Sequence, residues 1–274
     1  FRRVLFRSMR DDAPINIKGW QPENYAKDYR GPVTLTEALS QSLNTVAVRL
    51  GLEVGPKTIA LTAQRLGIRS KLDANASIAL GTSAVTPLEL VSAYASFANG
   101  GVSVEPYVIT EVITRDGDLL YTRPDATPNQ VIDPSILANF NLMMRETLKS
   151  GTAKKADLPG WDAAGKTGTS QDFRDAWFIG YTGALVTGVW LGNDDNSPTK
   201  HVAGGSLPVE IWSRFMKQSL AKTKPIMLPA SDVPQTDLFS VLGRALFGAQ
   251  SQNNGVPQKG PLILQPQTDA VPAQ

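Results

Sequence analysis

A lysine stands among small and hydroxyl-bearing residues in the run Ala163-Ala-Gly-Lys166-Thr-Gly-Thr169. β-Branched and aromatic residues dominate two following runs, 175–181 and 185–191, which predicts a hairpin. We expect the lysine run to form a third strand of that sheet. Gly165 and Gly168 lack a Cβ, so another backbone can approach there closely. A fixed cation, hydroxyls and accessible backbone suit an extended ligand that ends in a carboxylate. Taken alone, the run more simply predicts an edge strand with one solvated lysine.

A competing motif overlaps this lysine, because the residues from Gly160 to Thr167 fit the phosphate-loop pattern G-x-x-x-x-G-K-[ST]. Such a loop binds phosphate only between a buried strand and a helix whose N-terminal amides face the anion. Residues 151–159 do not form a hydrophobic strand, and a predicted hairpin rather than a helix follows. We therefore reject nucleotide binding.

The composition restricts the chemistry further. The 274 residues are 42% hydrophobic, which is enough for a sizeable core, and no run of eighteen apolar residues predicts a transmembrane helix. Cysteine is absent, which excludes disulfides and thiol catalysis. The single histidine, His201, has no metal-ligating companions and no Gly-x-Ser-x-Gly motif beside it. We expect no metal or cofactor, and any acyl transfer would use lysine as its base.

The charge argues against a nucleic-acid partner. The net charge is +2, but three arginines lie in the first eight residues, and without them 24 basic residues face 25 acidic ones. This leader, residues 1–8, is too short and too charged for a signal peptide, so we interpret it as foreign sequence.

Polar, proline-containing sequence from Asp12 to Gly31 predicts an extended loop before the first helix. Thr34 and Glu37 fit a capping box, and the helix that they begin runs into a Ser-, Asn- and Thr-rich segment that predicts a turn. Ser42 and Asn44 lie in this turn, which taken alone carries no function.

Further helices are predicted over 56–66, 87–98, 133–150 and 208–220, and an excursion hairpin over 107–121. In the third of these helices we expect one apolar face toward a core, formed by Ile136, Leu137, Phe140, Leu142, Met143 and Leu148. These elements assign residues 9–223 to one domain, which the resemblance described below implies is partial. From residue 224 the composition shifts to Pro, Gln, Ser and Asn, which predicts a largely disordered tail to residue 274, with a short amphipathic helix at 238–247.

The order of two motifs then indicates a family. Ser42-Leu43-Asn44 and Lys166-Thr167-Gly168-Thr169 stand more than one hundred residues apart, as the Ser-x-Asn and Lys-Thr-Gly motifs of β-lactamases and penicillin-binding proteins do. From about residue 12 to residue 217 the sequence resembles the transpeptidase domain of class A, bifunctional penicillin-binding proteins. The other segments that carry this resemblance are Pro22–Tyr25, Gly31–Leu35, Ala38-Leu39, Ala79–Gly81, Thr86–Leu88, Asp175–Phe178 and Gly192–Asp194.

The resemblance implies an α/β (α+β) fold of the penicillin-binding-protein and β-lactamase type, with an antiparallel sheet flanked by helices. Family members have five strands, two of which precede the nucleophile. We expect those two strands to be missing, which leaves the Lys166 strand and the hairpin, with an unpaired edge on the run 185–191.

The resemblance also implies roles in a peptidoglycan D,D-transpeptidase. Ser42 would relay protons to the leaving amine, Lys166 would support that relay, and Asn44 would hold the substrate amide. Thr167 and Thr169 would bind the terminal carboxylate. The backbone beyond Gly168 would supply an oxyanion donor. The partners are stem peptides ending in D-Ala-D-Ala, and β-lactams would inhibit by mimicking that end.

One departure from the family is large. The nucleophilic Ser-x-x-Lys should lie some tens of residues before Ser42, and nothing there fits. The string Ser197-Pro-Thr-Lys200 follows the lysine strand, where the family has no nucleophile, so we interpret it as coincidence. We expect an N-terminally truncated, inactive fragment of a serine-type enzyme. In the native chain, an upstream glycosyltransferase domain and a membrane anchor would hold this domain in the periplasm.

Two alternatives remain open. The chain could be a non-catalytic module that binds stem peptides and regulates another protein. It could also belong to a serine β-lactamase or a D,D-carboxypeptidase, although the amino-acid sequences of residues 31–35 and 175–178 argue against this.

Overall fold

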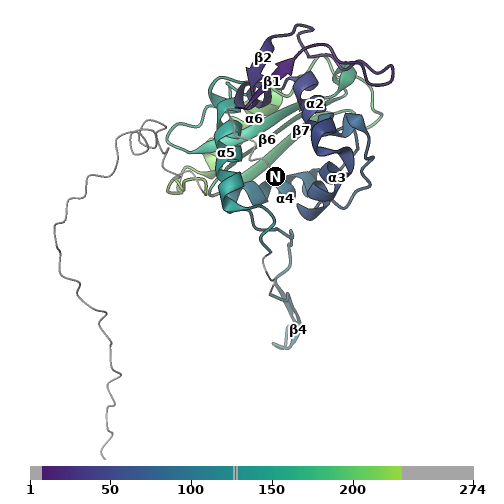
Figure 1. The fold of residues 1–274 in the computed structure, drawn as a ribbon. Coiled ribbons are helices and arrows are strands. Elements are labelled where there is room, and N and C mark those ends of the chain that lie inside the picture. Colours follow the sequence, from purple (N-terminus) through teal and green to yellow (C-terminus); the bar gives the residue numbers. More distant parts are fainter. Residues whose placement is uncertain (1–7, 126, 128, 230–274) are drawn as a thin grey trace, which may run out of the picture. The chain divides into compact units, whose positions relative to one another are not determined.

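The computed structural model describes residues 8–125, 127 and 129–229 (Figure 1). Most of the expected leader, and residues 230–274 of the predicted tail with its helix at 238–247, lie outside these residues. The start of that tail at residue 224 is wrong, because Leu228 is buried in a core cluster and its N–H donates to Asp162 Oδ2 at 2.9 Å. The strands are β1 (Met9–Asp12), β2 (Gly31–Thr34), β3 (Glu111–Ile113), β4 (Leu119–Thr122), β5 (Ala163–Thr169), β6 (Asp175–Thr182) and β7 (Val186–Gly192). The helices are α1 (Leu35–Ser40), α2 (Asn44–Val54), α3 (Pro56–Arg65), α4 (Pro87–Ala98), α5 (Pro134–Lys149) and α6 (Leu207–Ser219), with 3-10 turns η1 (Ala76–Leu80) and η2 (Gln171–Phe173).

The central sheet is antiparallel with strand order β5-β6-β7. Its register places Lys166 opposite Ile179, and Ile179 opposite Gly188. The lysine strand and the following hairpin are therefore confirmed. Within the described part of the chain, no further strand pairs with the outer edge of β5 or of β7.

Helix α6 covers one face of this sheet, and its packing depends on a glycine. Trp212 is fully buried and its ring lies edge-on to Phe178, with centroids 5.2 Å apart. A Cβ on Gly180 would lie 2.6 Å from the Trp212 ring, so only glycine accommodates the indole there. The rest of this core cluster is Ala153, Ala156, Leu158, Val209, Met216 and Leu220.

Helices α4 and α5 cover the opposite face, where α5 buries polar side chains. Asn141 is fully buried and accepts a hydrogen bond from the Tyr181 hydroxyl at 2.8 Å. The apolar face predicted for this helix is therefore partly wrong, because Ile136 is 63% exposed and Leu142 is 38% exposed. The buried face of the helix includes Asn141, bonded to Tyr181, and Arg145, paired with Asp162, and it excludes Ile136.

The first strand pair, β1 with β2, was not expected. Arg10 pairs with Val33 in this ribbon, and Val33 is buried with Leu35 beside α1. Half of the predicted capping box is confirmed, since the Thr34 hydroxyl accepts from Glu37 N at 3.1 Å. The Glu37 side chain accepts from Arg30 Nη1 at 3.1 Å instead of returning to Thr34. The interval between the strands was predicted as an extended loop, and the structure confirms it apart from an isolated bridge between residues 17 and 20.

The predicted excursion hairpin forms as β3 and β4 and extends away from the sheet and helices (Figure 1). Every residue of both strands is exposed, including Leu120 at 68%. Its base is fixed, because Ser103 N donates to Asn129 O at 2.9 Å.

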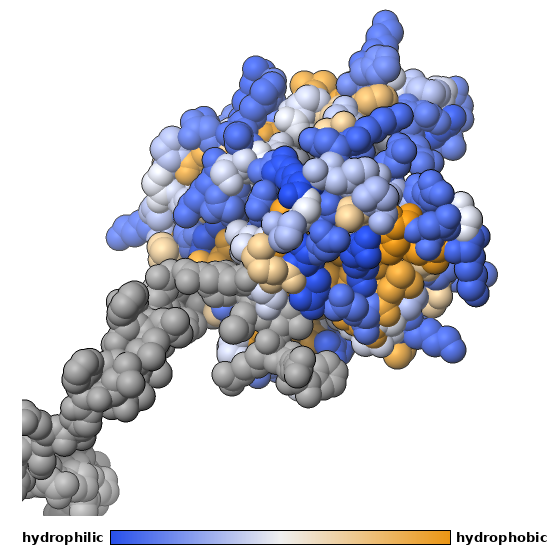
Figure 2. Space-filling view, turned by 45° about the horizontal axis from the view of Figure 1, so that its top comes forward, coloured by the Kyte–Doolittle hydropathy of each residue, from blue (hydrophilic) through white to orange (hydrophobic). Residues whose placement is uncertain are grey.

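Apolar side chains gather on one face of the molecule, bordered by hydrophilic ones (Figure 2). None of the described helices has both the length and the apolar character that crossing a membrane requires.

Candidate active site

The Ser42 turn joins helices α1 and α2. Helix α1 ends at Ser40 and α2 begins at Asn44, and Ser42 between them has a φ of 58°. This left-handed conformation is uncommon for a residue with a side chain. Buried Leu43 anchors the turn, and its N–H donates to Ala38 O at 2.9 Å. The predicted turn is therefore present, and its backbone holds the Ser42 side chain in one direction.

Lys166 on β5 reaches this turn. Its Nζ donates to Ser42 Oγ at 2.8 Å and to Thr167 O at 3.0 Å. Burial lowers the pKa of Lys166 from its ordinary value of 10.5 to about 8. A lysine with this pKa loses its proton at a pH much closer to neutrality than a solvated lysine does. The structure thus joins the two motifs, and Lys166 is not a solvated edge lysine.

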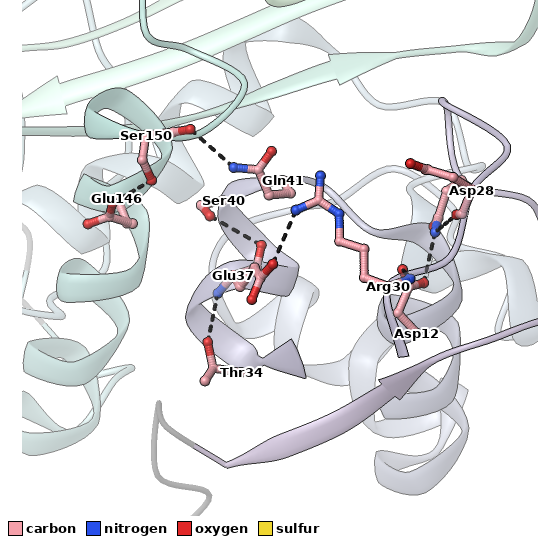
Figure 3. A network of polar contacts seen from close by, with 10 residues as sticks. Asp12, Asp28, Arg30, Thr34, Glu37, Ser40, Gln41, Glu146 and Ser150 are labelled. Atoms are coloured by element: carbon pink, nitrogen blue, oxygen red, sulfur yellow. Dashed lines mark hydrogen bonds and ion pairs between the residues drawn. The ribbon is translucent and has the colours of Figure 1, made fainter. Parts of the chain in front are cut away.

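Asn44 lies at the start of α2, and the loop between β1 and β2 holds its side-chain amide. Asn44 Nδ2 donates to Glu23 O at 2.8 Å. The same part of the chain is fixed by the fully buried carboxylate of Asp12, which accepts from Asn24 Nδ2 at 2.8 Å and from Arg30 N at 3.0 Å (Figure 3). Asp12 also accepts from Thr45 Oγ1. A buried carboxylate with three donors fixes the first turn of α2 and therefore the direction of Asn44.

The two threonines of the lysine strand are already hydrogen-bonded. Thr169 Oγ1 accepts from Gly204 N at 3.0 Å, and Thr167, only 9% exposed, has its Oγ1 2.6 Å from Thr152 Oγ1. A Cβ on Gly204 would lie 2.4 Å from Gly168 O. The loop before α6 therefore makes the close approach at Gly168 that the sequence suggested for a ligand.

Gly165 also differs from expectation. A Cβ there would lie 2.7 Å from Ile179 O and 2.8 Å from the Phe178 ring. Glycine at this position therefore serves packing inside the protein's own sheet.

The sequence reasoning missed the turn that follows α5. Thr152 N donates to Ser40 O at 3.0 Å. Beside it, Gln41 Nε2 donates to Ser150 O at 3.1 Å (Figure 3). A Cβ on Gly151 would lie 2.3 Å from Ser40 O, so this contact requires glycine. In the sequence, only the dipeptide Gly151-Thr152 marks this position. It is typical of an ordinary helix terminus and does not predict contact with the Ser42 turn.

An aromatic row crosses from the loop between β1 and β2 to the segments after β5 and β7. The Tyr25 ring is edge-on to Phe173 with centroids 6.3 Å apart, and Phe173 lies 4.8 Å from the His201 ring. Tyr25 is 72% exposed, so its ring is accessible to a ligand. His201 thus packs against Phe173 in the loop after β7.

The string Ser197-Pro-Thr-Lys200 lies in the loop after β7 and is tied to the aromatic row, since Thr199 N donates to Phe173 O at 3.0 Å. Asn193 Nδ2 donates to Ser197 Oγ at 3.1 Å, and Ser197 N donates to Asp195 Oδ1 at 2.9 Å. The phosphate-loop match fails as expected, because β5 continues through Lys166 to Thr169 and only the three-residue η2 follows.

The chain matches a known protein family and is similar to several of its members. The family described as penicillin binding protein transpeptidase domain matches residues 8–217, so the chain belongs to this family. It is 37% identical over 205 residues to Penicillin-binding protein 1A of Aquifex aeolicus (strain VF5), which covers 74% of this chain and 28% of the relative. It is 37% identical over 264 residues to Penicillin-binding protein 1A of Neisseria gonorrhoeae, covering 90% of this chain and 33% of the relative.

A solved structure agrees. The PonA1 protein from Mycobacterium tuberculosis, in complex with penicillin V, superposes with a TM-score of 0.75 at 28% identity, over 82% of this chain and 66% of that one. The mixed α/β fold and the resemblance to class A penicillin-binding proteins are therefore confirmed. The chain spans only 28–33% of the length of these curated relatives.

Proposed function

We propose that the chain provides part of the active site of a peptidoglycan D,D-transpeptidase that acts through a serine acyl-enzyme. The hydrogen bond from Lys166 Nζ to Ser42 Oγ, at 2.8 Å, carries this proposal in a chain of the transpeptidase family. A serine hydroxyl beside a lysine whose pKa is about 8 can accept and return a proton during acyl transfer.

The other residues divide the binding of the substrate. Asn44 holds the peptide amide, while Thr167 and Thr169 bind the terminal carboxylate beside the Lys166 ammonium. The backbone after Gly168 donates to the oxyanion. The PonA1 complex supports a site of this kind, since its ligand is penicillin V.

The attacking serine comes from elsewhere in this proposal. No Ser-x-x-Lys precedes Ser42 in the 274 residues, so we assign the nucleophile and its lysine base to sequence outside them. That serine attacks the penultimate D-Ala carbonyl and the terminal D-Ala leaves with a proton. An amine from a neighbouring stem peptide then displaces the serine and restores its hydroxyl. In this proposal residues 9–223 form part of the transpeptidase domain. In the whole protein a glycosyltransferase domain precedes it, and a membrane anchor holds both domains on the periplasmic side of the membrane.

Fluorescent penicillin tests the proposal on denaturing gels. We expect the complete native protein to be labelled, Lys166→Ala in it to reduce labelling by more than tenfold, and the exposed control Lys57→Ala to have no effect. We expect no label on the 274-residue chain by itself. An adduct on Ser42 or Ser197, located by mass spectrometry, would show that the nucleophile is wrongly assigned.

The hydrogen bond between Lys166 Nζ and Ser42 Oγ is also compatible with a second candidate, a module that binds stem peptides without catalysis. This candidate predicts that the complete native protein binds peptides ending in D-Ala-D-Ala but never becomes acylated. Rapid hydrolysis of the penicillin adduct would instead indicate a serine β-lactamase, and release of D-Ala without cross-linking would indicate a D,D-carboxypeptidase.

A further inference from the structure

The two hydroxyls of the Thr167-Gly-Thr169 segment each have a hydrogen-bonding partner behind them. Thr169 Oγ1 accepts from the backbone N–H of Gly204 at 3.0 Å, so its own proton remains available to donate. Thr167 Oγ1 lies 2.6 Å from Thr152 Oγ1, and either hydroxyl can be the donor. The direction of this one hydrogen bond decides whether Thr167 also has a proton to offer a ligand.

The backbone of Thr152 is fixed by its neighbours on two sides. Its N–H donates to Ser40 O at 3.0 Å, two residues before Ser42. A Cβ on Gly205 would lie 2.5 Å from Thr152 O, so the loop before α6 packs directly against this carbonyl. Thr152 therefore connects the Ser42 turn, the end of α5 and the loop that supports Thr169. Its hydroxyl is presented to Thr167 by a backbone with little freedom to move.

We propose that Thr152 is a positioning residue of the carboxylate-binding site. It donates its proton to Thr167 Oγ1 and thereby directs the Thr167 proton toward a ligand that ends in a free carboxylate. This rests on the proposed function, which puts the carboxylate at Thr167 and Thr169. An anionic ligand selects this direction, because a hydrogen bond to an ionised acceptor is stronger than one between neutral groups. Successive hydroxyls that donate in one direction also polarise one another.

The test uses the complete native protein and three substitutions. Thr152→Val removes the hydroxyl with little change of shape, Thr152→Ser retains it, and Thr167→Val removes the acceptor. Each protein is assayed with a D-alanyl thioester that ends in a free carboxylate and with the same thioester as its primary amide. We expect Thr152→Val to raise KM for the carboxylate substrate by about tenfold, as loss of a charge-directed hydrogen bond does. Its KM for the amide should stay unchanged, and Thr152→Ser should recover carboxylate recognition.

The outcomes separate this role from the wider proposal. If Thr167→Val reduces recognition of the carboxylate and Thr152→Val does not, the role of Thr152 is overturned and the proposed function stands. If neither substitution distinguishes carboxylate from amide, the site for the carboxylate is overturned together with Thr152. Equal loss on both substrates after Thr152→Val, at an unchanged unfolding temperature, would indicate a purely structural residue. Thr152→Ala provides the same comparison if valine impairs folding.

Discussion

Lys166 Nζ lies 2.8 Å from Ser42 Oγ, although 124 positions of sequence separate the two residues. One side chain comes from a strand and the other from a turn between helices, so the contact depends on packing of α1 and α5 beside β5. This relationship is the most direct link between the sequence motifs and a shared site.

The protonation of Lys166 should change stability with pH. Burial lowers its pKa to about 8, against 10.5 ordinarily, so the folded protein loses this proton at lower pH than the unfolded chain. Between these values the unfolded state binds more protons, and stability therefore rises with pH. Urea unfolding of the wild type and of Lys166→Met at pH 7.5 and pH 10 measures this. We expect the wild type to gain stability relative to the variant at the higher pH, whereas a constant difference would contradict the lowered pKa.

The buried carboxylate of Asp12 should be required for the first turn of α2. Asp12→Ala leaves the donors of Asn24, Arg30 and Thr45 without their acceptor. We expect the free energy of unfolding to fall by about 3 kcal/mol, because each buried donor left unsatisfied is costly. The exposed neighbour Asp11 provides a matched control, and Asp11→Ala should change stability by less than about 0.5 kcal/mol. Equal effects of the two substitutions in urea unfolding would refute the role of Asp12.

A buried ion pair should stabilise the start of the lysine strand. Arg145 Nε and Nη2 donate to the two carboxylate oxygens of Asp162 at 2.5 and 2.8 Å, and both side chains are only 10% exposed. Asp162→Asn leaves a buried guanidinium without its counter-ion, which typically costs about 3–5 kcal/mol. The exposed pair of Lys217 and Asp157 provides the control, since Asp157→Asn should cost less than about 1 kcal/mol. Thermal unfolding of both variants distinguishes these expectations.

The β3–β4 hairpin should be dispensable for the fold. Its strand residues are all exposed, and Ser103 and Asn129 already pair at its base. Joining these two residues by Asn-Gly, in place of 104–128, should leave the unfolding temperature within about 4 °C of the wild type. If circular dichroism shows the shortened protein to be unfolded at 25 °C, or to unfold well below the wild type, the hairpin supports the core.

The sequence predicted the central sheet well because its strands carry their own signals. β-Branched and aromatic residues marked β6 and β7 to within a residue or two. The expectation that Ser42 and Lys166 would meet came from the resemblance to the transpeptidase family. The strand β1 carried no such signal. Its residues, Met-Arg-Asp-Asp, have little strand propensity, and the pairing with β2 defines it.

The errors on α5 and around the threonines have a common cause. Hydrophobic periodicity assigns polar side chains to solvent, but Asn141 and Arg145 face inward because Tyr181 and Asp162 satisfy them. Thr152 was missed in the same way. Its meaning depends on a neighbour fifteen residues further on, whose hydroxyl the fold brings within 2.6 Å.

The left-handed backbone at Ser42 costs local stability and places a hydroxyl beside Lys166. With a φ of 58°, this position would be occupied with less strain by glycine, which meets no steric penalty there. Glycine would relieve the turn and at the same time remove the oxygen that Lys166 contacts. The chain therefore retains a locally unfavourable residue at the position where its side chain, and not its backbone, meets the lysine.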